Sequence, residues 1–180
     1  MKRPVAAKTS RVFFALWPDE PVRASLAQLT QALQGECGGR VMAAPNIHAT
    51  LAFIGNVPSE RVADLEALAS AINGTAFELS IDVLSYWRHN RIVWAGTSAC
   101  PVALATLAAD FQHALQADGW HVDERPYVLH ITLLRDARRG PATSALQAIR
   151  WSISRFALVL SHNDAAGTHY TPLTFWRLRG

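Results

Sequence analysis

Two short stretches of the sequence carry the same residue pattern inside apolar surroundings. HATLAF covers residues 48–53 and HITLLR covers residues 130–135, and each places a histidine two positions before a threonine. Side chains of a β-strand alternate between its two faces, so residues i and i+2 point the same way. The pattern therefore predicts two strands, each with an imidazole and a hydroxyl on one face and core residues on the other.

The rest of the chain divides into segments with strand or helix signals. Alternation and β-branched or aromatic content predict strands over residues 11–17, 40–44, 49–55, 77–87, 91–96, 130–135, 156–161 and 174–179. Helical periodicity, with proline at the start and glycine at the end, predicts helices over residues 19–33, 59–72 and 101–118. A short fourth helix is expected over residues 143–149.

This order of strands and helices is typical of an α+β fold, and its two halves look alike. The chain has 180 residues and no glycine- or serine-rich linker between the halves. We therefore expect one domain with two lobes over residues 1–180, in which residues 1–10 form a flexible N-terminal extension.

Composition limits the class of protein. Half of the residues are hydrophobic and 17% are charged, as in globular and not disordered proteins. The apolar run at residues 12–17 is too short for a signal peptide or a membrane span. Cys37 and Cys100 show neither metal-ligand spacing nor a disulfide framework, which favours reduced thiols in the cytoplasm. A net charge of +3 permits an anionic ligand without requiring one.

Two adjacent strands with this pattern would bring two imidazoles and two hydroxyls together. A neutral imidazole can take a proton from water while a protonated one gives a proton to a leaving oxygen. The histidine pKa of about 6.5 allows both forms near neutral pH. Threonine hydroxyls can donate hydrogen bonds to phosphate oxygens. A single strand histidine is more often structural, but the repeated pattern favours phosphodiester chemistry at His48, Thr50, His130 and Thr132.

A metal site is the main competing use of histidine. A zinc site needs three or four His, Cys or carboxylate ligands, and no His-Glu-x-x-His or paired-cysteine motif is present. Asp136 is the only acidic residue close to either motif. We therefore expect no metal and no cofactor.

Four segments together resemble the 2H phosphoesterase superfamily, and within it the RNA 2′,3′-cyclic phosphodiesterases, also described as 2′-5′ RNA ligases. The segments are RVFFALWPDEPVR at residues 11–23, NIHATLAFIGNV at 46–57, LHITLLRDAR at 129–138 and LVLSHNDAAGTHYTPLTFWRL at 158–178. The resemblance spans nearly the whole chain. One departure is Leu129, where the family often has proline before the second motif.

The resemblance implies a bilobal fold with two mainly antiparallel sheets, pseudo-two-fold symmetry, outer helices and an active cleft between the lobes. It implies metal-independent hydrolysis of a 2′,3′-cyclic phosphate to a 2′-phosphate. His48 would then protonate the leaving 3′ oxygen, His130 would activate water, and Thr50 and Thr132 would hold the phosphate. The motifs alone are chemically symmetric and assign neither acid nor base.

Further candidates surround the motifs. Arg135 is expected to contact the phosphate only if a bulge or the strand end turns it, because its offset from Thr132 is odd. Phe14 and Phe53 could stack on a base, although most phenylalanines on strands belong to the core, and Tyr127 could line the cleft. Arg11 could contact the phosphate in the same way, although a charge that begins a strand is usually only solvated. Three more arginines could steer RNA towards the cleft, although exposed surface is the more common explanation: Arg125, Arg138 and Arg139.

The expected partners are nucleotides and RNA ends with a 2′,3′-cyclic phosphate, with no membrane, for a monomeric protein. Three alternatives remain open at this point. They are 2′-5′ ligation at the same site, a binding module without turnover, and a cyclic phosphate on a small ribose derivative.

Overall fold

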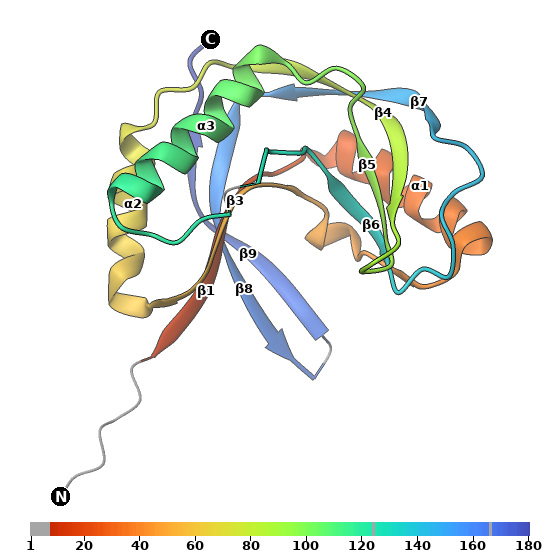
Figure 1. The fold of residues 1–180 in the computed structure, drawn as a ribbon, viewed down its shortest axis with the longest axis horizontal. Helices are drawn as coiled ribbons and strands as arrows, with labels where there is room; N and C mark the ends of the chain where they lie inside the picture. Colours follow the sequence, from red (N-terminus) through yellow and green to blue (C-terminus); the bar gives the residue numbers. More distant parts are fainter. Residues whose placement is uncertain (1–7, 124, 166) are drawn as a thin grey trace, which may run out of the picture.

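The structure is a computed structural model that describes residues 8–123, 125–165 and 167–180 (Figure 1). Its strands are β1 (Thr9–Leu16), β2 (Arg40–Val41), β3 (Ala49–Pro58), β4 (Phe77–Trp87), β5 (Ile92–Gly96), β6 (Ile131–Arg135), β7 (Ala145–Ile153), β8 (Arg155–Asp164) and β9 (Gly167–Arg177). Its α-helices are α1 (Glu20–Cys37), α2 (Val62–Ala71) and α3 (Val102–Ala117), and two 3₁₀ turns, η1 and η2, cover Ala44–Asn46 and Ser59–Arg61.

The strands form one antiparallel sheet with two halves. The order is β7-β4-β5-β6-β3-β1-β8-β9, and β2 pairs with the far end of β6. The two motif strands meet in the middle, where the pair Ala49 and Ile131 is the register contact between β3 and β6. The expected two sheets are thus joined by this narrow contact. We call β3-β1-β8-β9 the first half-sheet and β6-β5-β4-β7 the second half-sheet.

The helices cross between the half-sheets. In the units β1-α1-β3 and β5-α3-β6, a helix connects two neighbouring strands of one half-sheet. Helix α1 nevertheless packs against β6 and β7 of the second half-sheet, whereas α3 packs against β3 of the first. Figure 1 shows this arrangement, with α2 and α3 on the side of β1 and β8 and α1 on the side of β5 and β6. This exchange relates the two halves by an approximate two-fold axis.

Local sequence explains the helix that covers the second half-sheet. The Asp19 carboxylate accepts a hydrogen bond from the backbone N–H of Val22 at 3.3 Å, and Pro21 lies in the first turn. Gly38 follows the last turn with φ of 68°, a conformation that glycine adopts without strain. The buried residues recur every three or four positions: Val22, Leu26, Thr30, Leu33 and Cys37.

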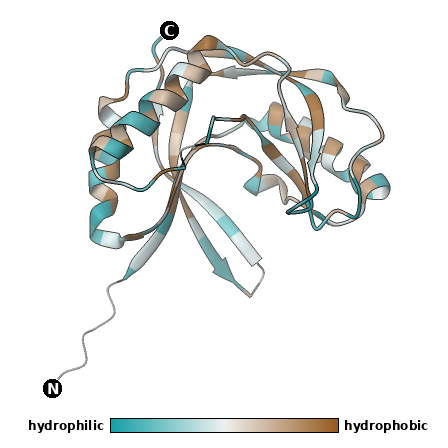
Figure 2. Ribbon diagram, viewed as in Figure 1, coloured by the Kyte–Doolittle hydropathy of each residue, from teal (hydrophilic) through white to brown (hydrophobic). Residues whose placement is uncertain are grey.

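A continuous apolar core links both half-sheets with the helices. It includes Phe14 and Phe156 from the first half-sheet, Leu79 and Trp151 from the second, and Phe111 from α3. In Figure 2 hydrophobic colours follow the central strands, and hydrophilic colours mark the β4–β5 turn and the end of β8. None of the helices in the described part of the chain is long and apolar enough to span a membrane.

One sequence prediction about an element is wrong. The short helix expected at residues 143–149 is the start of strand β7, whose Ile149 and Trp151 pair with Ile81 and Leu79 of β4. The alternation of Ile149, Trp151 and Ile153 is the strand signal, and pairing with β4 prevails over helix propensity. Of the expected N-terminal extension, residues 1–7 lie outside the described residues, and Thr9–Leu16 is already strand.

Candidate active site

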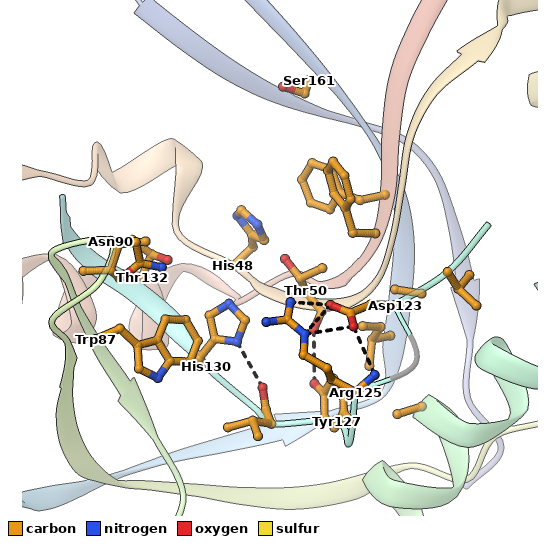
Figure 3. Close-up of a pocket in the computed structure, with 18 of the residues that line it drawn as sticks. His48, Thr50, Trp87, Asn90, Asp123, Arg125, Tyr127, His130, Thr132 and Ser161 are labelled. Atoms are coloured by element: carbon orange, nitrogen blue, oxygen red, sulfur yellow. Dashed lines mark hydrogen bonds and ion pairs between the residues drawn. The ribbon is translucent and has the colours of Figure 1, made fainter.

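The two halves of the sheet border a cavity of about 840 Å³ (Figure 3). Both motifs line it, and the rest of its wall comes from the β4–β5 turn with the strand ends beside it, helix α3 and the segment after it, and strands β1, β8 and β9. The structure therefore brings together two stretches that lie about 80 residues apart in sequence.

The expected alternation of side chains holds in both motifs. His48, Thr50, His130 and Thr132 are partly exposed and line the cavity. Their neighbours point into the core and are at most 5% exposed: Ile47, Ala49, Leu51, Leu129, Ile131 and Leu133. The apolar residues around each histidine thus belong to the rear of the strand, as predicted.

Each histidine ring is fixed by the backbone carbonyl two residues before it. His48 Nδ1 lies 2.7 Å from the Asn46 oxygen, and His130 Nδ1 lies 3.0 Å from the Val128 oxygen. A carbonyl only accepts hydrogen bonds, so both Nδ1 atoms carry the proton and donate it. Each Nε2 is then left for proton transfer, and no partner for it is present among the described residues.

Each motif strand bulges at its leucine. Phe14 and Ala15 of β1 pair with Ala52 and Thr50, which skips Leu51. On the other strand, Val93 and Trp94 of β5 pair with Leu134 and Thr132, which skips Leu133. An extra residue reverses the alternation beyond it. The residue three positions after each threonine therefore returns to the cavity side.

These returning residues are Phe53 and Arg135, and both line the cavity. The sequence prediction for Arg135 depended on such a bulge, and the structure contains it. In the described part of the chain, no ion pair or hydrogen bond involves the Arg135 guanidinium. Burial is the main cause that lowers the pKa of His48 and of His130, and the Arg135 charge lowers both pKa values further.

The two histidines differ in their surroundings. Three aromatic rings enclose His48, with Trp17 stacked at 5.7 Å and Phe13 and Tyr170 each at 4.9 Å between ring centroids. Burial lowers the His48 pKa to about 4, against the opposing effect of its hydrogen bond to Asn46. His130 meets Trp87 at 4.7 Å, and burial lowers its pKa as well.

Of the two other aromatic residues predicted for the site, Phe14 lies in the core and Tyr127 lies at the cavity. The expectation for Phe14 is wrong, because its ring is fully buried against Phe111, Phe156 and Trp176. Tyr127 lines the cavity, and its hydroxyl donates to the Thr50 carbonyl at 3.1 Å. Burial raises its pKa, so it stays a neutral donor that supports β3.

The additional arginines separate into two groups. Arg11 and Arg125 line the cavity, and the Arg11 guanidinium lies over the Phe53 ring at 5.1 Å. Arg138 and Arg139 do not line it, and Arg139 instead donates to the Glu36 carbonyl at 2.8 Å.

Sequence reasoning missed the rings around the histidines. Phe13 shares the face of β1 that carries Arg11, and Trp17, directly after the strand, packs in the same cluster as Phe13. Phe14 shares the opposite face with Val12 and Leu16. A charged residue at one end of an alternating strand marks its open face, and this signal could have selected Phe13 over Phe14. Trp87 and Tyr170 lie far from both motifs in sequence and had no such signal.

The acidic residue beside the second motif has a structural role. Asp136 accepts hydrogen bonds from Arg40 at 2.9 Å and from Arg91 at 3.1 Å. Its φ is +56°, and the chain turns there directly after Arg135. Within the described ranges, no three His, Cys, Asp or Glu side chains are grouped so that they could hold a metal ion.

Comparisons with known proteins agree with this geometry. A family described as LigT like Phosphoesterase matches residues 16–94. The chain is 33% identical to the RNA 2′,3′-cyclic phosphodiesterase of Escherichia coli (strain K12), over 96% of this chain and 98% of that protein. It is 28% identical to the Thermus thermophilus protein of the same name, over 94% of this chain and 91% of that protein.

Solved structures extend the similarity to three dimensions. The crystal structure of E. coli LigT complexed with 3′-AMP superposes with a TM-score of 0.88 at 32% identity, covering 95% of this chain and 99% of that one. The chain belongs to the LigT-like phosphoesterases of the 2H superfamily, the family of the RNA 2′,3′-cyclic phosphodiesterases.

Proposed function

We propose that this protein hydrolyses the 2′,3′-cyclic phosphate at the end of an RNA chain to a 2′-phosphate, without a metal ion. The observation that carries the proposal is the matched pair of imidazoles. His48 and His130 each donate Nδ1–H to a backbone carbonyl and leave Nε2 for proton transfer at one cavity. The names of the relatives support the same reaction.

In the proposed reaction, His130 takes a proton from water as the water oxygen forms a bond to phosphorus. The bond between phosphorus and O3′ breaks, and His48 donates a proton to O3′. The products are a 2′-phosphate and a free 3′-hydroxyl. These roles follow the family resemblance, whereas the hydrogen bonds at the two rings are equivalent.

Three further groups suit the charge that builds up on the non-bridging oxygens. The hydroxyls of Thr50 and Thr132 line the cavity, and the structure shows no hydrogen-bond partner for either one in its described residues. The Arg135 guanidinium can form two parallel hydrogen bonds to a phosphate. Donors already in position need no reorganisation when the transition state forms.

The reaction requires opposite protonation states for the two histidines, and the free protein disfavours the charged form of both. The pKa values of His48 and His130 lie below 6.5 because the rings are buried and because Arg135 is near. A bound phosphodiester brings a negative charge, which raises the pKa of both imidazoles. Substrate binding thus favours the proton that His48 must donate.

The nucleoside has an aromatic platform on the first half-sheet. Phe53 is 47% exposed and lines the cavity, at the position that matches Arg135 on the other strand. Aromatic side chains stack on bases of single-stranded RNA. We propose that Phe53 supports the terminal base while Arg135 holds the phosphate.

The test uses adenosine 2′,3′-cyclic phosphate and separates 2′-AMP from 3′-AMP by chromatography, with and without EDTA. We expect 2′-AMP alone, at the same rate in EDTA. Formation of 3′-AMP, a loss in EDTA that zinc restores, or no turnover by the folded protein would each contradict the proposal. Adding RNA with a 5′-hydroxyl measures ligation, which is the same chemistry in reverse.

A further inference from the structure

The segment after α3 holds an arginine at the cavity and is anchored to the first half-sheet. The Asp123 carbonyl accepts a hydrogen bond from Gln112 of α3 at 3.4 Å. Tyr127 donates to the Thr50 carbonyl on β3 at 3.1 Å. Both anchors belong to the side of the cavity that carries His48. Arg125 lies between them and lines the same cavity.

Arg125 is charged and exposed, and among the described residues its ion-pair partner is Asp123 of its own segment. Its side chain is 83% exposed, and its guanidinium pairs with Asp123, two residues earlier. The Arg125 backbone N–H also donates to this carboxylate at 3.0 Å. Exposed ion pairs of this kind contribute little to stability. The pair fixes where the guanidinium lies but offers little resistance to a competing anion.

The pair lies at one side of the cavity, beside Thr50 and away from Trp87. Figure 3 shows Arg125 and Asp123 on the side of Thr50 and Tyr127, with His130 between them and Trp87. The histidines, the threonines and Arg135 already supply proton transfer and phosphate contacts at the centre. At 840 Å³ the cavity lies in the upper part of the range of about 300–1,000 Å³ for small-molecule sites. Space therefore remains beyond the centre, together with Arg125 and with Arg11, whose guanidinium lies over the Phe53 ring.

We propose that Arg125 binds the internucleotide phosphate on the 5′ side of the terminal nucleotide. This inference rests on the proposed function, because it assumes that the terminal cyclic phosphate occupies the centre. Arginine forms short, charge-assisted pairs with phosphate oxygens, and the carboxylate of Asp123 holds the guanidinium in place until RNA arrives. Arg125 thereby distinguishes an RNA end from a free cyclic mononucleotide, which has no second phosphate.

The experiment compares kcat/KM for three substrates. They are adenosine 2′,3′-cyclic phosphate, an ApA dinucleotide that ends in a 2′,3′-cyclic phosphate, and the same dinucleotide with an uncharged methylphosphonate between its nucleosides. The proteins are wild type, Arg125→Ala, Asp123→Asn and the control Arg150→Ala. Arg150 is an exposed arginine of β7 that does not line the cavity.

We expect Arg125→Ala to lower the ratio of dinucleotide to mononucleotide kcat/KM by about tenfold to a hundredfold, mainly through KM. The ratio for the methylphosphonate substrate should not change, and Arg150→Ala should change neither ratio. Asp123→Asn should lower KM for the charged dinucleotide, because the competing carboxylate is lost. For the charged dinucleotide, the slope of log KM against the logarithm of the salt concentration should be smaller by about 0.7 in Arg125→Ala, which corresponds to the loss of one phosphate contact.

An unchanged ratio in Arg125→Ala, with the protein folded by circular dichroism, overturns the inference. An equal loss on charged and uncharged dinucleotides also overturns it, because the contact would then involve a base or sugar. If wild type turns over no substrate, the proposed function fails instead. The mononucleotide reaction of wild type separates these two results.

Discussion

The strands β3 and β6 carry the same motif and the same backbone devices, but their surroundings differ. Both histidines donate Nδ1–H to the carbonyl two residues earlier, and both strands bulge at the leucine of the motif. Three rings enclose His48, whereas among the described residues His130 meets the ring of Trp87. The bulges return Phe53 to the cavity on one strand and Arg135 on the other.

The difference indicates how an approximately symmetric fold can bind an asymmetric substrate. The shared part places the imidazoles and hydroxyls, which every 2′,3′-cyclic phosphate needs. The unshared part adds an aromatic ring on the side of the first half-sheet and a guanidinium on the side of the second. A nucleotide end has a base on one side of its ribose and a phosphate on the other, and these two groups fit the two sides.

The largest effects should come from the shared histidines. His48→Ala and His130→Ala should each lower kcat by about 10²–10⁴-fold, because each removes one proton-transfer group. Steady-state hydrolysis of adenosine 2′,3′-cyclic phosphate measures this, with His113→Ala on the exposed face of α3 as the control. Activity near that of wild type in either cavity variant would show that its imidazole takes no part.

Phe53 and Arg135, which differ between the two strands, should affect different kinetic parameters. Arg135→Ala should lower kcat by about 10²–10³-fold, since its charge faces the transition-state oxygens. Phe53→Ala should raise KM by about tenfold, as expected for loss of a stacked base. Measuring both parameters on a cyclic mononucleotide tests the division of roles. If both variants changed kcat and KM to the same extent, the proposed division between transition-state stabilisation by Arg135 and base binding by Phe53 would be contradicted.

The threonines should again behave alike. Thr50→Val and Thr132→Val keep the shape of the side chain and remove one donor to the phosphate, so each should lower kcat/KM by about tenfold to a hundredfold. Thermal unfolding should change less, because neither hydroxyl has a partner among the described residues. Full activity in both variants would reduce the hydroxyls to ordinary strand residues.

The smallest effect concerns stability, and it should set the two histidines apart. The His48 pKa is about 4 in the folded protein and close to 6.5 in the unfolded chain. The unfolded state therefore binds more protons at acid pH, and stability falls as the pH decreases from 6.5 towards 4. The full penalty is about 3 kcal/mol at 1.36 kcal/mol per pKa unit.

His48→Gln should remove part of this acid-dependent loss. Urea unfolding of wild type and of this variant at about pH 7 and about pH 4.5 compares their free energies of unfolding. His130→Gln serves as the matched variant for the other strand. An identical pH dependence in wild type and His48→Gln would contradict the depressed pKa.

The sequence was sufficient to place His48 and His130 on strands and to predict the alternation around them. On a regular strand, residues two positions apart always share one face. The return of Arg135 could not be predicted, because the bulge depends on pairing with β5. The choice between Phe13 and Phe14 could have been made from Arg11, which marks the open face of the strand that Phe13 shares.

Long-range pairing accounts for the remaining differences. Residues 143–149 form strand because β4 offers them an edge to pair with. The narrow junction of β3 and β6 turns the two expected sheets into one. Arg125 reaches the cavity through anchors on α3 and β3, which no local pattern encodes.

The pH dependence of kcat/KM for wild type, His48→Ala and His130→Ala tests the two-histidine mechanism most directly. We predict a bell-shaped pH profile for wild type with its optimum below pH 6.5, because the pKa values of both His48 and His130 are lowered in the free protein. His130→Ala should lose the acid limb and His48→Ala the alkaline limb. Exchanged limbs would reverse the acid and base roles. A flat wild-type profile, or both limbs intact in both variants, would contradict acid–base catalysis by this pair.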